Sequence, residues 1–273
     1  MAEAVCEVGE GPHWDRAARR WSWVDNANGR LFVRDGGHTA LIRPQVDVVA
    51  AVPRQAGGWL LAAYDGLYDF DGEDATARPG PALSGTRFND GACDAHGRFW
   101  VGTMSLTGQA GQGVLYRVTD DMTAMAGGFD VCNGLGFSPD DRWLYIVDTG
   151  PRLIYRYAFD LKAGVIGERE AWFQFPAGMG KPDGLAVDAE GDVWCAMWDG
   201  ACLARVTSEG TLRETIGMPV PRPTSLAFGD NEILVTTARK GLSEDQLHDF
   251  PLSGQPLWLP TAVTGARRYA FAF

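Results

Sequence analysis

The chain has 273 residues, 45% of them hydrophobic, and its 24 Lys and Arg against 35 Asp and Glu give a formal net charge of −11. The apolar content excludes wholesale disorder, and the negative charge argues against a nucleic-acid-binding groove, which needs clustered positive charge. No apolar run approaches the roughly 20 residues that span a bilayer, and Met1 to Val5 lack the basic start and apolar stretch of a secretory signal. We therefore expect a cytoplasmic protein with no membrane or nucleic-acid partner, and its 5 Cys, which include no Cys-x-x-Cys pair, as reduced core thiols.

A repeated unit begins at Glu10. Counted from Glu10 as position zero, Asp15 stands at position five and Trp21 at position eleven. The leading residues of the six copies, in chain order, are Glu10, Val48, Asn89, Asn133, Asp183 and Thr224. Four of the copies carry tryptophan at position eleven, namely Trp21, Trp59, Trp100 and Trp194. Successive leading residues are 38, 41, 44, 50 and 41 positions apart, and repeats of about 40–45 residues made of short strands are typical of β-propeller blades.

Within each copy the pattern is an apolar strand, a polar turn and a second strand that carries an aromatic residue. Position five holds Asp94, Ser138 and Asp188 in the third, fourth and fifth copies, and all three are good turn openers. Tight turns are expected after the second strands, at Asn26-Ala27-Asn28-Gly29, Asp65-Gly66, Thr149-Gly150, Asp199-Gly200 and Lys240-Gly241. Third strands are expected over residues 30–33, 66–70, 113–117, 153–157 and 202–206. The sequence thus predicts an all-β protein, a single six-bladed β-propeller over residues 1–273 with four-stranded antiparallel blades.

Residues 4–8 precede the first copy and have no blade of their own. A circular array of sheets must hide its seam, because exposed strand edges invite aggregation. We therefore predict that this N-terminal strand closes the propeller by supplying the outer strand of the last blade.

The six leading residues are expected to form one ring, because the innermost strand of every blade runs along the central channel. This ring gathers two carboxylates and two amides, and Glu10, Asn133 and Asp183 are each followed by glycine. Converging oxygen ligands without His or Cys suit a hard divalent cation, and two carboxylates in a narrow mouth are costly unless something neutralises them. The alternative is that these residues only cap turns.

Three further features surround the expected mouth. Arg87 enters the ring two residues before Asn89, either as a forked donor to a polyol or carboxylate or as a surface ion pair. The glycine-rich segment 103–113, which contains Gln109, is too irregular for a strand and reads equally as a lid over the mouth or as a long blade connection. Trp198 ends a second strand, where it is either the floor of a sugar pocket or a half-buried surface aromatic.

At these positions the chain resembles the senescence marker protein / gluconolactonase / regucalcin family over nearly its whole length. The motifs that carry the resemblance are Gly9-Glu10-Gly11-Pro12, Arg87-Phe88-Asn89-Asp90-Gly91, Gly97-Arg98-Phe99-Trp100-Val101-Gly102-Thr103-Met104, Asn133-Gly134-Leu135 and Pro182-Asp183-Gly184. The stretch from Thr236 to Ser243 is similar to bacterial sugar lactonases. Family members are six-bladed propellers with one divalent metal ion in the channel mouth.

The resemblance implies a role for each matching residue. It places Glu10, Asn133 and Asp183 on the metal, with Asp183 also as the proposed base. Arg87 and Asn89 would contact the substrate. Some relatives have a substrate-binding Glu in the lid where this chain has Gln109, which removes a charge.

The implied reaction is hydrolysis of an aldono-lactone, such as a xylono-, arabinono- or gluconolactone, to its aldonic acid by a monomer or weak homodimer. The metal, which is Ca²⁺, Zn²⁺, Mn²⁺, Mg²⁺ or Fe²⁺, would polarise the carbonyl, and Asp183 would orient or activate water. Two alternatives stay open. One is a propeller hydrolase of aryl esters or organophosphates, and the other is a calcium-binding protein without catalytic activity.

Overall fold

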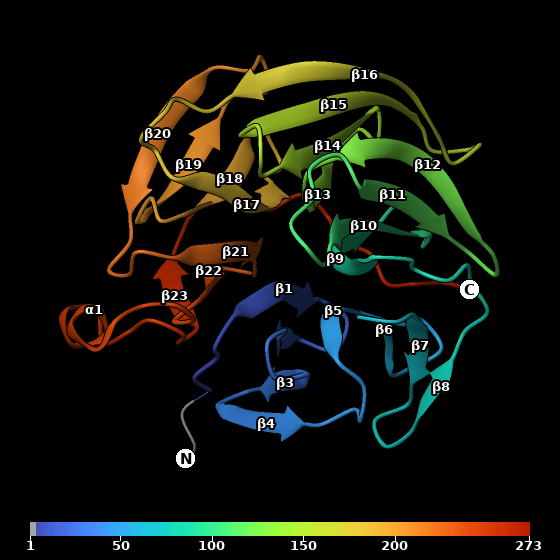
Figure 1. Ribbon diagram of the computed structural model, residues 1–273, viewed down its shortest axis with the longest axis horizontal. Helices are drawn as coiled ribbons and strands as arrows, with labels where there is room; N and C mark the ends of the chain where they lie inside the picture. The colour runs from blue at the N-terminus through green and yellow to red at the C-terminus, as the bar shows by residue number, and fades with distance from the viewer. Residues whose placement is uncertain (1–3) are drawn as a thin grey trace.

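The computed structural model describes residues 4–273 and contains six antiparallel β-sheets arranged around one axis (Figure 1). The first three blades consist of β1 (Gly9–Asp15), β2 (Arg20–Asp25), β3 (Arg30–Asp35) and β4 (His38–Ile42); β5 (Val48–Pro53), β6 (Trp59–Ala63), β7 (Leu67–Phe70) and β8 (Ala75–Ala77); and β9 (Thr86–Cys93), β10 (Phe99–Ser105), β11 (Gly113–Val118) and β12 (Met122–Phe129). The last three consist of β13 (Cys132–Phe137), β14 (Trp143–Asp148), β15 (Leu153–Asp160) and β16 (Val165–Gln174); β17 (Lys181–Val187), β18 (Val193–Trp198), β19 (Cys202–Val206) and β20 (Leu212–Gly217); and β21 (Pro223–Phe228), β22 (Glu232–Thr237) and β23 (Leu257–Pro260). The six-bladed propeller predicted from the repeat is confirmed.

Burial falls from the axis outward within each blade. The inner strand β5 is buried along its whole length, whereas the outer strand β16 is mostly exposed. The core lies between neighbouring blades: the Trp100 ring of the third blade packs edge-on against Phe137 and Phe159 of the fourth, with ring centroids 6.2 Å and 5.6 Å apart. The predicted turns at 26–29, 65–66, 149–150 and 199–200 join the second and third strands of their blades, and the five predicted third strands are present.

A buried carboxylate explains why Asp recurs six residues before Trp. Asp188 is fully buried, and its Oδ2 accepts a hydrogen bond from Trp194 Nε1 at 2.9 Å, while its Oδ1 accepts from the backbone N–H groups of Glu190 and Asp192, each at 3.0 Å. Asp94 holds Trp100 Nε1 in the same way, also at 2.9 Å. One side chain therefore closes the turn between the first two strands and fixes the aromatic residue that fills the gap to the next blade.

The last blade differs from the prediction in two ways. After Thr237 the chain leaves the sheet, forms the short helix α1 (Glu244–Asp249), and only then returns as β23, which is the third and outermost strand of this blade within residues 4–273. Ser243 caps α1, because its side chain accepts a hydrogen bond from Gln246 N and the Gln246 side chain accepts one from Ser243 N.

Within residues 4–273, no helix has the length and apolar character needed to cross a bilayer.

The N-terminal residues reach the last blade but do not form its outer strand, so that part of the prediction is wrong. Val8 makes a single antiparallel bridge to Ala238, and Glu7 O accepts from Arg239 N at 3.0 Å. The backbone N–H groups of Glu7 and Val8 donate instead to the Asp25 carboxylate of the first blade, at 3.2 Å and 3.1 Å. These two donors are therefore not available to a sheet edge, and the segment ties the first blade to the last as a connector. Residues 1–3, which entered the argument against a secretory signal, lie outside the described residues.

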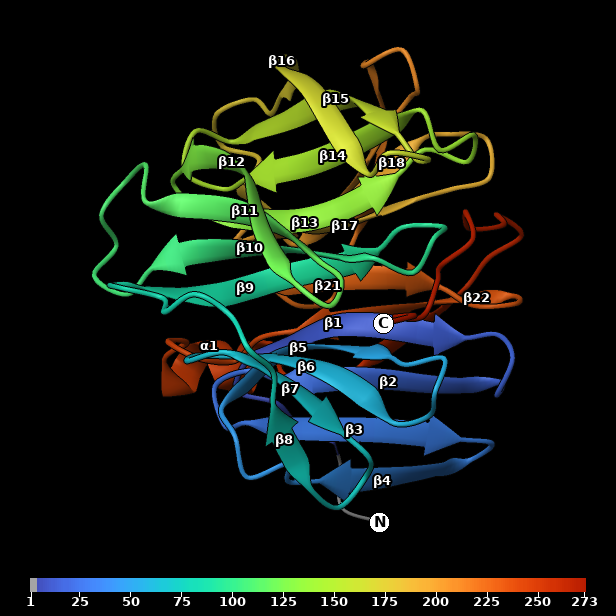
Figure 2. The same ribbon diagram turned by 90° about the vertical axis from the view of Figure 1, so that its right-hand side faces the viewer.

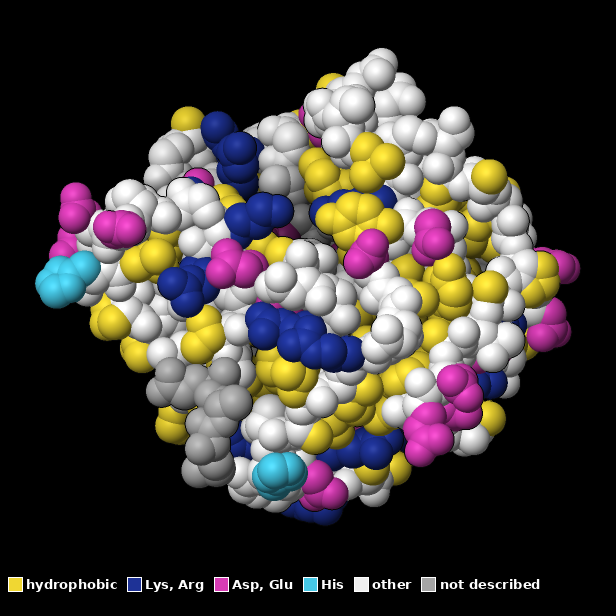
Figure 3. Space-filling view, turned by 60° about the horizontal axis from the view of Figure 1, so that its bottom comes forward, with side chains coloured by type: hydrophobic (Ala, Val, Ile, Leu, Met, Phe, Trp, Pro, Cys, Tyr) yellow, Lys and Arg dark blue, Asp and Glu magenta, His cyan; other side chains and the backbone are white. Residues whose placement is uncertain are grey.

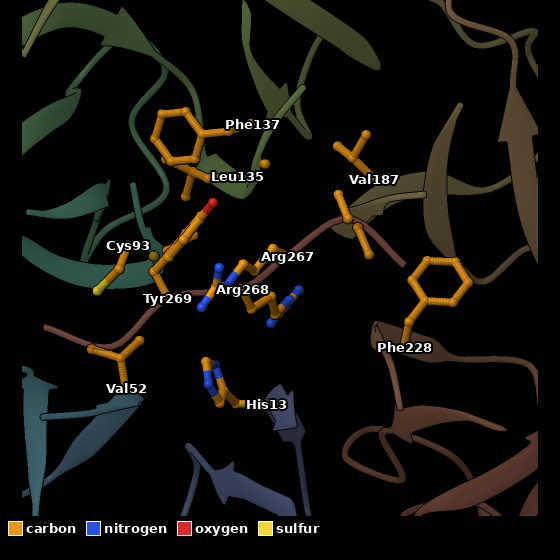
Figure 4. A pocket seen from close by; sticks show the side chains of 15 residues that line it. His13, Val52, Cys93, Leu135, Phe137, Val187, Phe228, Arg267, Arg268 and Tyr269 are labelled. Carbon is orange, nitrogen blue, oxygen red and sulfur yellow. The ribbon is translucent and has the colours of Figure 1, made fainter. Parts of the chain in front are cut away.

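The C-terminal residues 264–272 cross the channel at the ends of the inner strands. Ala266 N donates to Val187 O of the fifth blade at 2.9 Å, Phe271 N to Pro53 O of the second at 2.8 Å, and Ala272 N to Gly97 O of the third at 3.0 Å. Gly97 has a φ of +77°, and a Cβ there would lie 2.4 Å from the Ala272 Cβ, so this close crossing requires glycine. Figure 4 shows the crossing segment carrying Arg267, Arg268 and Tyr269 over the channel.

Candidate functional site

The predicted ring of polar residues lies at the mouth opposite the crossing segment. Asn133 on β13 and Asp183 on β17 are both buried, and Asn133 Nδ2 donates to Asp183 Oδ1 at 2.5 Å and to Thr149 Oγ1 at 3.0 Å. Glu10 on β1 is partly exposed and interacts electrostatically with Asp183. In the space-filling view the surface is hollowed, with Lys and Arg, Asp and Glu, and hydrophobic side chains around the depression (Figure 3).

A β-bulge or register shift lies at, or directly after, every leading position of the ring. In each of the six inner strands the register with the second strand shifts at this point, for example between Glu10 and His13 and between Pro182 and Leu185. Bulges re-aim side chains and are common beside active sites. Four leading residues fall within the shift and have no partner in the ladder, namely Asn89, Asn133, Asp183 and Thr224. Glu10 and Val48 still pair with the second strand, and the shift follows them directly.

The glycines after the ring residues let the inner strands approach closely. A Cβ at position 134 would lie 2.6 Å from Asp183 O, and one at position 184 would lie 2.1 Å from Ser225 Oγ. Gly11 meets no such neighbour, but its φ of +53° is in the region that favours glycine. Gly134 and Gly184 are therefore required by close approach of the strands, and Gly11 by its positive φ.

Three acidic side chains, Glu10, Asp90 and Asp183, lie close together in the channel. Burial, followed by the neighbouring charges of Asp183 and Asp90, holds the pKa of Glu10 well above its ordinary value. Burial also raises the pKa of Asp183, although the hydrogen bond from Asn133 opposes the shift, and it raises the pKa of Asp90. The site therefore disfavours its own ionised carboxylates unless a cation offsets them.

The donor set fits a divalent cation. Both hydrogen bonds of the Asn133 amide use Nδ2, and in residues 4–273 no protein donor is bonded to its Oδ1, which leaves that oxygen available as a ligand beside two carboxylates. No three His, Cys, Asp or Glu side chains of the described chain come together closely enough to share a metal. A metal at the ring would therefore take two carboxylates and an amide oxygen, a hard set with room for exchangeable ligands.

Arg87 and Asn89 lie together beside the ring, on β9. Arg87 Nη1 donates to Phe88 O at 2.7 Å and to Asn89 Oδ1 at 3.3 Å, and Asn89 Nδ2 donates to Cys132 O at 3.4 Å. The Arg87 guanidinium lies over the Tyr64 ring, 5.0 Å from its centroid. Arg87 is thus held by the backbone and an aromatic face and makes no ion pair within 4.0 Å in the described chain.

Gln109 and Trp198 lie farther out. The irregular segment is shorter than predicted, residues 106–112, because Thr103 belongs to β10 and its Oγ1 accepts from Val114 N at 2.9 Å. Gln109 is exposed on this connection, which lies on the same side of the propeller as α1 and the start of β1 (Figure 2). Trp198 is half-buried at the end of β18, and the Arg222 guanidinium lies 5.0 Å from its ring centroid.

Three charged or titratable channel residues were not predicted as part of the site. Asp90, His13 and Arg268 line the same small cavity of about 10 Å³ inside the channel. Arg268 Nη1 donates to Pro12 O at 2.7 Å, and its charge acts on both His13 and Asp90. The repeat assigns one ring residue per copy, so it does not single out Asp90, and Arg268 lies beyond the last copy. Figure 4 shows His13 close to Arg268.

His13 predicts a dependence of stability on acid pH. Burial, together with Arg268, lowers the pKa of His13 from 6.5 to about 3. Between these pH values the unfolded chain binds a proton that the folded chain excludes, so this contribution to stability is complete above pH 6.5 and is lost as pH falls toward 3. We expect the unfolding free energy from urea titrations to fall by up to about 1.4 kcal/mol per pH unit more steeply in the wild type than in His13→Asn. Equal slopes in the two proteins would contradict the prediction.

Comparisons with known proteins agree with this architecture. The sequence profile of the SMP-30/Gluconolactonase/LRE-like region matches residues 8–239. A 6-deoxy-6-sulfogluconolactonase of Pseudomonas putida is 36% identical, over 97% of this chain and 95% of its own, and a pentonolactonase of Haloferax volcanii is 35% identical, over 87% and 84%. The crystal structure of a calcium-binding protein, regucalcin, from Agrobacterium tumefaciens superposes with a TM-score of 0.90 at 27% identity and covers 98% of this chain and 94% of its own.

Proposed function

The chain belongs to the SMP-30/gluconolactonase/LRE-like family, and from this premise we propose that it hydrolyses a sugar lactone to the corresponding aldonic acid. The observation that supports this most directly is the bulged ring in which Asn133 binds Asp183 at 2.5 Å beside Glu10. The relatives include a 6-deoxy-6-sulfogluconolactonase and a pentonolactonase, which match 97% and 87% of this chain.

In this proposal Glu10, Asn133 and Asp183 hold one divalent metal ion. Both carboxylates have pKa values raised by burial and by their acidic neighbours, which is the electrostatic environment a cation relieves. When bound, the ion supplies a positive charge that polarises the lactone carbonyl.

The protein's own residues orient the reactants and transfer the proton. Asp183 accepts a proton from the water whose oxygen bonds to the carbonyl carbon, and the bond from that carbon to the ring oxygen then breaks, with the proton delivered to the departing oxygen. Arg87 and Asn89, fixed to each other at 3.3 Å, bind the sugar hydroxyls. Gln109 and Trp198 contact the outer part of the substrate from the β10–β11 connection and from β18.

A lactone panel tests this function. Metal is removed from the purified protein with a chelator, and the chelator is removed by dialysis. The protein is then assayed with pentono- and hexonolactones after separate addition of Ca²⁺, Mg²⁺, Mn²⁺, Zn²⁺ or Fe²⁺. Aryl esters and phosphotriesters are assayed in parallel. We expect no turnover without metal and turnover of at least one sugar lactone after metal addition. Turnover of the aryl or phosphate esters alone would replace the proposal with the ester-hydrolase alternative. Metal binding without turnover of any substrate would replace it with the calcium-binding alternative.

A further inference from the structure

A second cleft opens between the first two blades, next to the ring. Its volume is about 480 Å³, which is within the range of about 300–1,000 Å³ typical of small-molecule sites. Its lining comes from the β2–β3 turn, the β4–β5 connection, the β6–β7 turn and strand β7. The residues are Asn28, Gly29, Arg43, Gln45, Val46, Asp47, Tyr64, Asp65 and Tyr68.

Tyr64 and Arg87 lie between the cleft and the ring. Tyr64 lines the cleft, and its ring carries the Arg87 guanidinium 5.0 Å from the centroid. On the other side, Arg87 contacts Asn89 at the ring. Asp47, also in the cleft, directly precedes Val48, the leading residue of the second blade. A molecule bound at the ring next to Arg87 therefore has the cleft as its nearest extension.

The walls of the cleft are held by hydrogen bonds and close packing. Tyr64 N donates to Asp47 O at 3.2 Å, and the Tyr68 hydroxyl donates to Asp65 Oδ2 at 3.0 Å. A Cβ on Gly29 would lie 2.9 Å from Val46 O, so the β4–β5 connection packs against the bare backbone of the β2–β3 turn. The backbone contacts fix the three connections relative to one another, and the side chains of Arg43, Gln45, Asp47, Tyr64 and Asp65 are exposed on them.

The lining has the chemistry that recognises a neutral polyol. Two tyrosine rings offer faces for C–H groups, and Asp47, Asp65 and Asn28 offer acceptors and donors for hydroxyl groups. The charged groups are two carboxylates and one guanidinium, Arg43, so the formal charge is −2 + 1 = −1. With the Arg87 guanidinium against Tyr64 the sum is −1 + 1 = 0, so the cleft has no excess positive charge to bind an acidic extension of the substrate.

We propose that this cleft binds a neutral glycosyl unit attached to the lactone, so that the preferred substrate class is a disaccharide aldonolactone. The inference rests on the proposed function, because it places the lactone ring at Glu10, Asn133 and Asp183. The glycosyl unit then lies past Arg87, against Tyr64 and Tyr68, with its hydroxyls toward Asp47 and Asp65.

The test compares glucono-1,5-lactone with cellobiono- and maltobiono-1,5-lactone, after subtraction of spontaneous hydrolysis. We expect a higher kcat/KM for at least one disaccharide lactone, carried by a lower KM. Asp65→Ala is expected to lower the ratio of disaccharide to monosaccharide kcat/KM about tenfold, the effect of about 1.4 kcal/mol. The matched control is Asp35→Ala, which removes another exposed carboxylate at the end of β3 in the first blade, outside the cleft lining, and should leave the ratio unchanged.

Direct binding separates failure of this inference from failure of the proposed reaction. Binding of cellobiose, maltose and glucose is measured by calorimetry on the wild type and Asp65→Ala. Hydrolysis of gluconolactone with no disaccharide preference and no effect of Asp65→Ala on the ratio overturns the inference and leaves the lactonase proposal standing. Disaccharide binding that weakens in Asp65→Ala, without hydrolysis of any lactone, supports the cleft and overturns the reaction. If the protein neither binds a disaccharide nor hydrolyses a lactone, both the cleft inference and the lactonase proposal are overturned.

Discussion

Replacing Asp183 by asparagine is expected to lower kcat for sugar-lactone hydrolysis by about 10²- to 10⁴-fold, the usual contribution of a positioned general base. The substitution preserves the shape of the side chain and one of its two oxygens but removes the carboxylate that is proposed to take the proton from water. Its effect should therefore fall on kcat more than on metal affinity, which calorimetry on the chelated protein measures separately. An Asp183→Asn variant with the wild-type kcat would show that Asp183 is not the base.

The control for this experiment is Thr149→Val. Thr149 Oγ1 accepts the second hydrogen bond of Asn133 at 3.0 Å but is not one of the three proposed ligands. Removing it loosens the orientation of Asn133, so we expect a weaker metal affinity and a smaller loss of kcat than in Asp183→Asn. If Thr149→Val and Asp183→Asn lost kcat equally, the loss in Asp183→Asn would reflect distortion of the ring.

Replacing Asp188 by alanine is expected to lower the free energy of unfolding by about 3 kcal/mol, because each buried donor left without an acceptor costs about 1–3 kcal/mol, while Arg205 keeps its ion pair with Asp192 at 2.8 Å. Asp188 is fully buried and binds Trp194 Nε1 and Arg205 Nη2, each at 2.9 Å, as well as two backbone N–H groups. Without it these donors lose their shared acceptor inside the protein. Urea unfolding followed by tryptophan fluorescence measures the change.

The repeat supplies a matched control for this measurement in Asp15, which holds the same position in the first copy. Asp15 Oδ1 accepts from Ala17 N at 3.1 Å and Ala18 N at 3.0 Å, but its side chain is 20% exposed and Trp21 Nε1 bonds to Glu232 instead. Asp15→Ala therefore removes a turn cap open to water, which is worth about 1 kcal/mol. Equal losses in Asp15→Ala and Asp188→Ala would show that the buried network adds nothing to the turn.

The repeat carried most of the fold prediction because its signals are local. Asp188 and Trp194 lie in one hairpin, so their spacing follows from the length of a strand and a turn. The ring was also predictable, because homologous positions in successive blades must meet at the axis. That argument required only the spacing of residues such as Glu10, Asn133 and Asp183.

Features that depend on non-local packing were not predictable from the spacing. The bulges allow two consecutive residues of β9, Asn89 and Asp90, to take part in the channel, and nothing in the periodicity marks Asp90. Nothing in the sequence of residues 4–8 shows that the Asp25 carboxylate binds the N–H groups of Glu7 and Val8, so the pattern alone predicts an outer strand. Arg268 reaches the channel from a segment with no repeat at all.

The C-terminal crossing makes the channel a blind well. Residues 264–272 are bonded to the second, third and fifth blades, and the space left beneath them, lined by residues such as His13 and Tyr269, is only about 50 Å³. Under the proposed reaction, a sugar acid formed at the ring would leave through the same opening by which the next lactone arrives, because within residues 4–273 the crossing segment closes the other end of the channel. The acid would then have to leave before the next lactone could bind, so we expect the product of the proposed reaction to inhibit it competitively.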